Sequence, residues 1–209
     1  MGTDRLEESF SARLRELYKL EKAPETLDEL TDFWKRGFAK AFQTPKGRQF
    51  LVALARGESV YGACGTKTRH TVRLQGKAGI HVACALDAMI EGVFQSVEIE
   101  SSCPHCEERI AMRMVDRQII SAVPQSLVLW LGISPRGEGP TVETVCPFIN
   151  FFSSQDHHRR WRDINLDQVG VLMSLSQARD FIAGALPLSS ALEAEDSSSD
   201  VTTIQLEPF

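Results

Sequence analysis

The sequence predicts an α+β fold, with a helical N-terminal region and a core of mostly antiparallel strands. The first third repeats its apolar residues every three or four positions, as a helix with one buried face does. From about Lys67 apolar and polar residues alternate, as in a half-buried strand. We therefore expect a helical region over residues 1–60, a mixed α+β domain over 61–186 and a tail over 187–209.

Three helices are expected in the first region. Residues 6–17 carry one apolar stripe on a charged helix. Thr26 followed by Glu29 matches a capping box, which opens a second, aromatic-rich helix that extends to Phe42. A third, short helix covers residues 50–57. Aromatic rows of this kind pack in a core or a dimer interface, so the second helix is expected to do one or the other.

The strands follow in the middle region, and a last helix closes it. Ser174 and Gln177 match a second capping box, which opens that helix and runs it to Leu186. Strands are expected where apolar residues alternate with polar ones or form short continuous runs. These segments are 68–74, 97–99, 110–114, 126–132, 144–152 and 168–175.

The formal charge of −5 comes from 23 Lys and Arg against 28 Asp and Glu. Five of these acids, and no Lys or Arg, lie in the Ser-rich tail 187–209, so the rest of the chain is formally neutral. Such a tail is typical of disorder, although its last stretch, VTTIQLEPF, could also dock as a strand or act as a peptide motif. A neutral body without a basic patch argues against nucleic-acid binding.

Five cysteines (Cys64, Cys84, Cys103, Cys106 and Cys146) occur in a chain that opens with the polar stretch MGTDRLEESF and has no long apolar run. We expect no signal peptide, no membrane span and a cytoplasmic, reducing location. In that setting cysteines are more often catalytic or metal-binding than joined in disulfides.

Cys84 and Asp87 lie where a strand-like IHVA passes into a helical pattern. A spacing of three places thiol and carboxyl on one helix face, where they could act as nucleophile and acid. A cysteine in a first helical turn can also have its pKa lowered by the helix dipole. The alternative is a small buried cysteine beside an ordinary first-turn aspartate.

Cys103 and Cys106 form a C-x-x-C between two expected strands, and Cys146 precedes a proline at the entrance of another. The C-x-x-C could be part of a zinc site, which needs further ligands from Cys64, His70, His81 or His105, or it could supply accessory thiols. The strand that follows it disfavours a redox dithiol. The basic cluster 156–162 is interpreted as a solvated helix start, with two adjacent histidines that make a poor metal pair.

The order of these elements resembles the organomercurial (alkylmercury) lyase family over residues 68–186. The resemblance rests on CALDAMI, the strand that reaches Cys103, SLVLWL, CPFINFFSS and the segment VGVLMSLSQARDFIAGAL. It implies a lyase fold and a catalytic triad of Cys84, Asp87 and Cys146. In such a lyase two thiolates bind mercury, a soft cation, and the carboxyl passes a proton to the leaving carbon.

The resemblance also implies partners and a cellular role. No cofactor is required, Hg(II) remains as bound product on Cys84 and Cys146, and cellular thiols or a mercuric reductase would receive it. The role would be mercury resistance and detoxification of a small organomercurial substrate, by a monomer or a homodimer. Nucleic acid and membrane are not expected as partners.

Three features depart from the family pattern. Pro147, Phe148 and Asn150 follow Cys146 where known lyases carry another cysteine and histidines. Cys106 is an addition, and the N-terminal winged-helix-like module is poorly matched, so the helices of residues 5–56 would cover the core or dimerise in its place. Two alternatives therefore stay open: a metal-binding or metal-delivery protein on the same fold, and a lyase for another carbon–heteroatom substrate.

Overall fold

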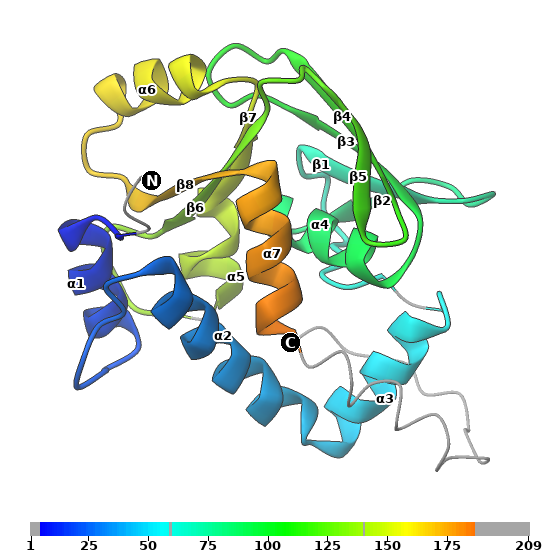
Figure 1. The fold of residues 1–209 in the computed structure, drawn as a ribbon, viewed down its shortest axis with the longest axis horizontal. Coiled ribbons are helices and arrows are strands. Elements are labelled where there is room, and N and C mark those ends of the chain that lie inside the picture. The colour runs from blue at the N-terminus through cyan, green and yellow to red at the C-terminus, as the bar shows by residue number, and fades with distance from the viewer. Residues whose placement is uncertain (1–4, 59, 140, 187–209) are drawn as a thin grey trace.

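Two antiparallel sheets enclose a central helix in the computed structural model, which describes residues 5–58, 60–139 and 141–186 (Figure 1). The five-stranded sheet has the order β2-β1-β3-β4-β5, and the three-stranded sheet has the order β7-β6-β8. All pairs of neighbouring strands are antiparallel. The predicted α+β class is therefore confirmed.

The five-stranded sheet contains the alternating segments of the sequence. In β3 the residues Val97, Ile99 and Ser101 are buried and their neighbours are more exposed, so one face of the sheet forms core. The strand Gln118–Val123, at the edge of this sheet, was not predicted from the sequence. Most of its residues are exposed, and it shows no clean alternation of buried and exposed residues. The strands are β1 (His70–Leu74), β2 (Ile80–Val82), β3 (Val97–Ser102), β4 (Arg109–Val115) and β5 (Gln118–Val123).

The three-stranded sheet is built around the apolar run 126–132, whose strand β6 (Val128–Ile133) is buried along almost all its length. It pairs with β7 (Ile149–Phe152) on one side and with β8 (Val169–Ser174) on the other. A continuous apolar run fits this central position, since both faces of β6 are covered.

The helix α4 (Ala85–Phe94) lies between the sheets and contacts β1 and β3 of one and β6 and β7 of the other. Every residue from Ala85 to Val93 is buried. A helix that is buried all round is a core element, so whatever α4 carries at its N-terminus lies at the junction of the two sheets.

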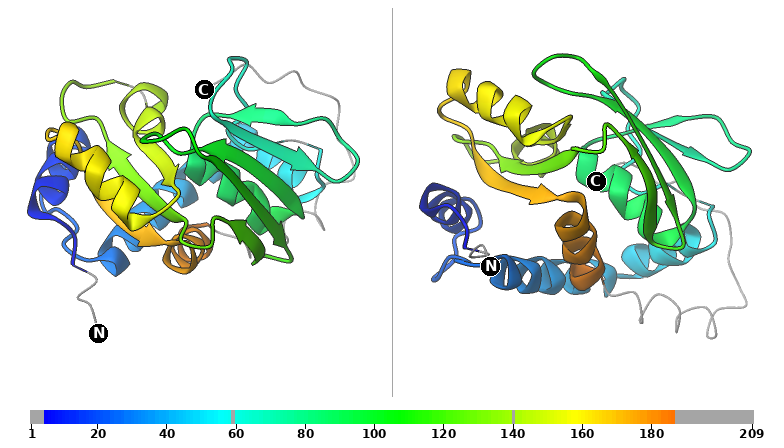
Figure 2. Two further views of the ribbon diagram at one scale, coloured as in Figure 1. Left: turned by 90° about the horizontal axis from the view of Figure 1, so that it is seen from above. Right: turned by 45° about the horizontal axis from the view of Figure 1, so that its top comes forward.

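The N-terminal helices lie along one side of the molecule, with α1 at the left and α2 and α3 along the bottom of Figure 1, and Figure 2 shows the same helices in two further views. They are α1 (Glu8–Leu17), α2 (Leu27–Phe42) and α3 (Pro45–Ala55). α2 packs against α7 (Leu175–Ala185), and α1 packs against β8 and β6. Because Phe10, Leu14 and Leu30 belong to the same buried cluster as the sheets, these helices cover the core.

Helix caps follow the sequence closely. Thr26 accepts the N–H of Glu29 as expected, but the Glu29 carboxylate returns to the N–H of Glu25 rather than to that of Thr26. Ser174 and Gln177 form the complete reciprocal box at the start of α7. Both helix starts were therefore predictable from local chemistry.

One predicted strand is wrong over its first half. Residues 141–144 form the short helix α5 (Thr141–Thr144) and residues 146–148 form a 3₁₀ turn (Cys146–Phe148), so only Ile149–Phe152 is strand. Pro147 explains the difference, since its nitrogen has no hydrogen to donate to a sheet ladder. The tail 187–209 and its expected disorder lie outside the described residues, and within the described part no helix is both long and apolar enough to cross a bilayer.

Candidate functional site

Cys84 is the N-cap residue of α4, and its sulfur accepts the backbone N–H of Asp87 at 3.3 Å. β2 ends at Val82, so the chain turns from strand to helix directly at the thiol. Cys84 is 1% exposed and Asp87 is 7% exposed. The spacing of three therefore does place thiol and carboxyl on one face of the first helical turn, in a buried position.

Cys146 comes from the other half of the molecule. It opens the 3₁₀ turn that leads into β7, and the backbone of this turn is fixed by the Phe148 N–H, which donates to the Val145 carbonyl. Cys146 is half-buried, so it is more accessible than Cys84. The fold thus offers one deeply buried thiol and one thiol nearer the surface.

The sulfurs of Cys84 and Cys146 and a carboxylate oxygen of Asp87 all lie within 4.8 Å of one another. The two cysteines are 62 positions apart in the sequence and come from elements on opposite sides of the sheet junction. Two sulfur donors and a carboxyl at this separation can bind one soft metal ion and keep a proton carrier beside it.

Burial sets the proton affinity of this cluster. The pKa of the Cys84 thiol lies well above its usual value, because burial disfavours the thiolate and because Cys146 and the Asp87 carboxylate add to that effect. The effect of burial on the pKa of Cys84 therefore outweighs the lowering of that pKa that was expected from the helix dipole. Burial also raises the pKa of Asp87 to about 6, although Cys84 donors oppose the shift.

A second buried carboxyl lies one turn further along α4. Glu91 is fully buried, and burial raises its pKa to about 7, against the opposing effect of the Gln95 amide. Its two oxygens accept hydrogen bonds from the Tyr61 backbone N–H and from Gln95 Nε2. Asp87 adds to the shift by charge repulsion. Two carboxyls that titrate near neutrality are therefore four residues apart on the central helix.

The segment 60–64 covers the N-terminal half of α4. The Gly62 carbonyl accepts the Ala83 N–H at 2.9 Å, and the Cys64 N–H donates to the His81 carbonyl at 2.8 Å. Gly62 has a φ of 65°, in the left-handed region. A Cβ there would lie 2.7 Å from Asp87 Oδ2, so glycine is required for this close approach.

Two tyrosines border the cluster. Burial, followed by the charges of Asp87 and Cys84, raises the pKa of Tyr61. Burial also raises the pKa of Tyr18. The hydrogen bond between its hydroxyl and Thr141 opposes this rise, and the charge of Cys146 adds to it. Both hydroxyls consequently stay protonated at neutral pH.

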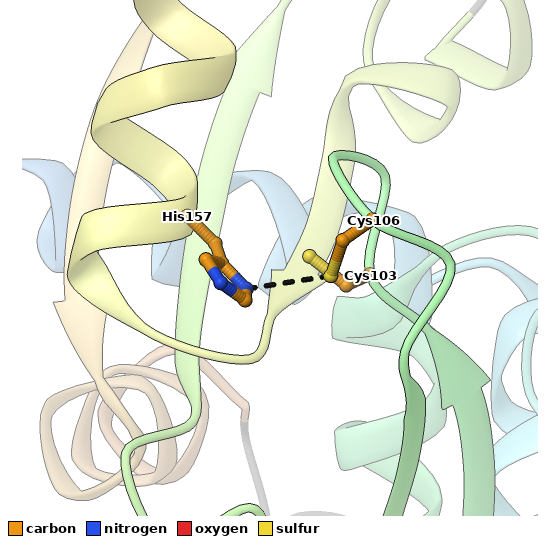
Figure 3. Close-up of side chains that lie close together, drawn as sticks. All are labelled: Cys103, Cys106 and His157. Carbon is orange, nitrogen blue, oxygen red and sulfur yellow. Dashed lines mark hydrogen bonds between the residues drawn. The ribbon is translucent and has the colours of Figure 1, made fainter.

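The C-x-x-C lies elsewhere, in the turn between β3 and β4. Cys103, Cys106 and His157 bring their ligand atoms within 4.8 Å of one another. Figure 3 shows the three side chains lying close together. His157 lies in the first turn of α6 (Gln155–Ile164) and was not selected from the sequence, because it was interpreted only as half of an adjacent histidine pair. The neighbouring His158 is buried against Trp130, so the two histidines do point apart.

The other candidate ligands are not part of this second cluster. Cys64 Sγ lies 3.0 Å from the Thr66 hydroxyl, and His70 Nδ1 lies 2.9 Å from the Ser101 hydroxyl. His81 Nδ1 is 3.3 Å from the Thr71 hydroxyl. Only the ring of His105 approaches, with its centroid 5.5 Å from that of His157.

One hollow on the surface is lined by none of the residues of the two clusters. It has a volume of about 560 Å³ and is lined by charged and small side chains of α1 and by residues near β8. No cysteine lines it. Thiol chemistry therefore belongs to the sheet junction rather than to this hollow.

A comparison with protein families gives one decisive match. The sequence model described as MerB, alkylmercury lyase, matches residues 64–186, which is more than half of the chain. The chain belongs to the alkylmercury lyase family. Cys84, Asp87 and Cys146 all lie within the matched range, and so do Cys103 and Cys106.

A solved structure described as the mercury-bound form of MerB2 is similar in fold as well. It shares 25% sequence identity and a TM-score of 0.52, over 63% of this chain. The chain spans 62% of the length of that protein, which is less than two thirds. A search of the curated proteins finds no match.

Proposed function

We propose that this member of the alkylmercury lyase family cleaves a carbon–mercury bond by protonolysis. Cys84 and Cys146 bind the mercury of the substrate, and Asp87 carries the proton. The observation that supports this most directly is the set of two sulfurs and one carboxylate within 4.8 Å, of which Cys84 and Asp87 are buried and Cys146 is half-buried. The family match and the mercury-bound state of the similar MerB2 structure support the choice of mercury.

Cys146 makes the first contact, because it is the more accessible thiol. The substrate R–Hg–X exchanges X for the Cys146 sulfur, and the proton of that thiol leaves with X.

Cys84 then provides both the second sulfur and the proton. Its raised pKa keeps the thiol protonated until mercury binds the sulfur, since metal binding displaces a thiol proton. The Asp87 carboxylate takes this proton and delivers it to the carbon, and the carbon–mercury bond pair becomes the new C–H bond. The products are R–H and Hg(II) bound to two thiolates. Mercury stays divalent throughout, so the reaction needs no redox cofactor.

The Asp87 pKa of about 6 suits this relay. At neutral pH the carboxyl is mostly ionised and can accept the thiol proton, yet it is acidic enough to release it again. The bound Hg(II) would leave to small cellular thiols or to a mercuric reductase. The half-buried Cys146 is the sulfur that such an acceptor can reach first.

The test is release of benzene from phenylmercury in the presence of excess thiol. Wild type should turn over, while Asp87→Asn should bind mercury with similar stoichiometry and lose about 10²- to 10⁴-fold in turnover, because proton transfer is removed. Cys64→Ser, whose thiol lies outside both clusters, serves as the matched control and should react like wild type.

The result also separates the proposal from its alternatives. A wild-type protein that binds Hg(II) tightly but releases no benzene would be a binding or delivery protein. Full turnover by Asp87→Asn would remove the carboxyl from the mechanism.

A further inference from the structure

The second cluster lies at a contact between the two halves of the fold. Cys103 and Cys106 come from the β3–β4 turn of the five-stranded sheet, and His157 comes from α6, which follows β7 of the three-stranded sheet (Figure 3). Cys106 Sγ lies 3.4 Å from His157 Nδ1, across 51 positions of sequence. Cys103 is fully buried, Cys106 is exposed and His157 is half-buried.

The backbone of the turn directs N–H groups at sulfur. The turn is closed by two bonds, from the Cys103 N–H to the Glu108 carbonyl and from the Glu107 N–H to the Cys103 carbonyl. Burial alone would raise the pKa of the Cys103 thiol, but hydrogen bonds from Ser153, His105 and Cys106 together lower it below its usual value. The turn therefore surrounds the Cys103 sulfur with hydrogen-bond donors.

The histidine is oriented by its surroundings. Ser154 caps α6 by accepting the His157 N–H, and the Ser153 hydroxyl lies 2.5 Å from His157 Nδ1. A Glu108 carboxylate oxygen lies 3.8 Å from the same nitrogen. An imidazole nitrogen and two sulfurs thus converge from the helix and the turn, and the Glu108 carboxylate lies beside the imidazole.

We propose that Cys103, Cys106 and His157 bind a Zn²⁺ ion, with the Glu108 carboxylate as the fourth ligand. Zinc takes four ligands in a tetrahedron, with Zn–S near 2.3 Å and Zn–N near 2.0–2.1 Å, so that its donor atoms lie about 3.5–3.8 Å apart. The present spacing of up to 4.8 Å closes to that value by small side-chain rotations. Thiolate and imidazole donors exclude Mg²⁺ and Ca²⁺, which prefer oxygen.

Such a site has a structural consequence that is separate from mercury chemistry. The ion would join the β3–β4 turn to the start of α6. It shares no residue with Cys84, Asp87 or Cys146. The site is therefore independent of the proposed function, and either one can fail without the other.

The experiment uses the full chain, reduced with a phosphine and freed of metal by a chelator. Zn²⁺ is titrated by competition with a chromophoric chelator, and Co²⁺ is titrated as a spectroscopic probe, since thiolate ligands give Co²⁺ an intense near-ultraviolet charge-transfer band. We expect one equivalent of either ion per chain. The Cys84→Ser/Cys146→Ser double variant should retain the band.

Cys106→Ser and His157→Gln should each weaken Zn²⁺ binding by more than about tenfold, since even outer partners of metal ligands change affinity by 10- to 100-fold. Cys106 is exposed, so its replacement leaves the fold intact, and circular dichroism of the metal-free variants checks this. Cys64→Ser is the thiol control and should bind like wild type. No charge-transfer band in reduced wild type, or an unchanged band in Cys106→Ser, would overturn the proposal.

Discussion

The two cysteine clusters contain the same number of thiols, yet the fold shifts the pKa of the buried cysteine in each cluster in opposite directions. Cys84 is buried, receives one N–H from Asp87 and faces a carboxylate, and its pKa is raised by burial first of all. Cys103 is buried too, but hydrogen bonds from Ser153, His105 and Cys106 outweigh that burial and lower its pKa. The number of N–H groups aimed at sulfur thus decides whether a buried cysteine stores a proton or a negative charge.

The third residue of each cluster, Asp87 in one and His157 in the other, also differs in the chemistry that it offers. Asp87, with a pKa of about 6, can take up and release a proton near neutral pH. His157, half-buried beside Cys106, offers a nitrogen to a metal ion. A reaction that ends with a proton on carbon needs the first arrangement, while a permanent metal site needs the second.

The largest expected effect separates the clusters by activity. Cys84→Ser should lose about 10³-fold or more in phenylmercury turnover, because both a mercury ligand and the stored proton are removed. Cys106→Ser should stay within about twofold of wild type in the same benzene-release assay. Similar losses in the two variants would mean that the clusters work as one site.

Gly62→Ala should have the next largest effect. Its added Cβ would lie 2.7 Å from Asp87 Oδ2, and its φ of 65° disfavours alanine, so the carboxyl must move. We expect turnover to fall roughly 10- to 100-fold, in line with the sensitivity of catalysis to small misplacements. The control is Gly65→Ala, where an added Cβ meets nothing within 4 Å. Equal activity of the two variants would count against the position of Asp87.

Glu91→Gln tests how much the buried charge of Glu91 lowers the free energy of unfolding. The folded-state pKa of Glu91, about 7, exceeds its ordinary value of 4.5, so the folded protein binds more protons than the unfolded chain between these values. The free energy of unfolding of wild type should therefore decrease as pH rises from 4.5 to 7, and the variant should lack this decrease. Above pH 7 the variant should be more stable by about 3 kcal/mol.

Urea denaturation between pH 4.5 and 8 measures that difference. The glutamine carbonyl can still accept the Tyr61 N–H, so the packing of α4 is kept. Glu98→Gln, on an exposed position of β3, is the control and should follow the wild-type pH dependence. A variant that loses stability at every pH would show that the charge of Glu91 is not what burial penalises.

The smallest effect concerns stability in the presence of zinc. At a free Zn²⁺ concentration of 100 Kd, binding to the folded state should stabilise wild type by about 2.7 kcal/mol. Cys106→Ser should show almost none of this gain, whereas Cys146→Ser should keep it. Thermal melts with and without Zn²⁺ measure the difference, and a gain that follows Cys146 instead would assign the ion to the other cluster.

Local features of the fold could be predicted from the sequence. The caps at Thr26 and Ser174 depend on side chains three residues apart, and so does the shared face of Cys84 and Asp87. The edge strand β5 could not be predicted, because its exposed residues leave no alternation. The start of β7 was misplaced, since a Cys-Pro pair fits a strand entrance as well as a 3₁₀ turn.

Contacts between segments that are far apart in the sequence could not be predicted from local sequence patterns. Nothing near Cys84 indicates Cys146, and only the family resemblance paired them. His157 escaped notice because its ligand partners lie 51 positions away, on the β3–β4 turn. The division of the chain at residues 60 and 186 and the roles of the site residues stay predictions.

The match to the family begins at residue 64, yet the backbone that shapes the catalytic helix begins earlier. The Tyr61 N–H binds the Glu91 carboxylate and Gly62 lies against Asp87, so both contacts belong to residues upstream of the matched range. A boundary drawn by homology would therefore separate the proposed site from the residues that contact it. A chimera that grafts this family segment onto another protein should be joined before Val60, so that its carboxyls keep their neighbours.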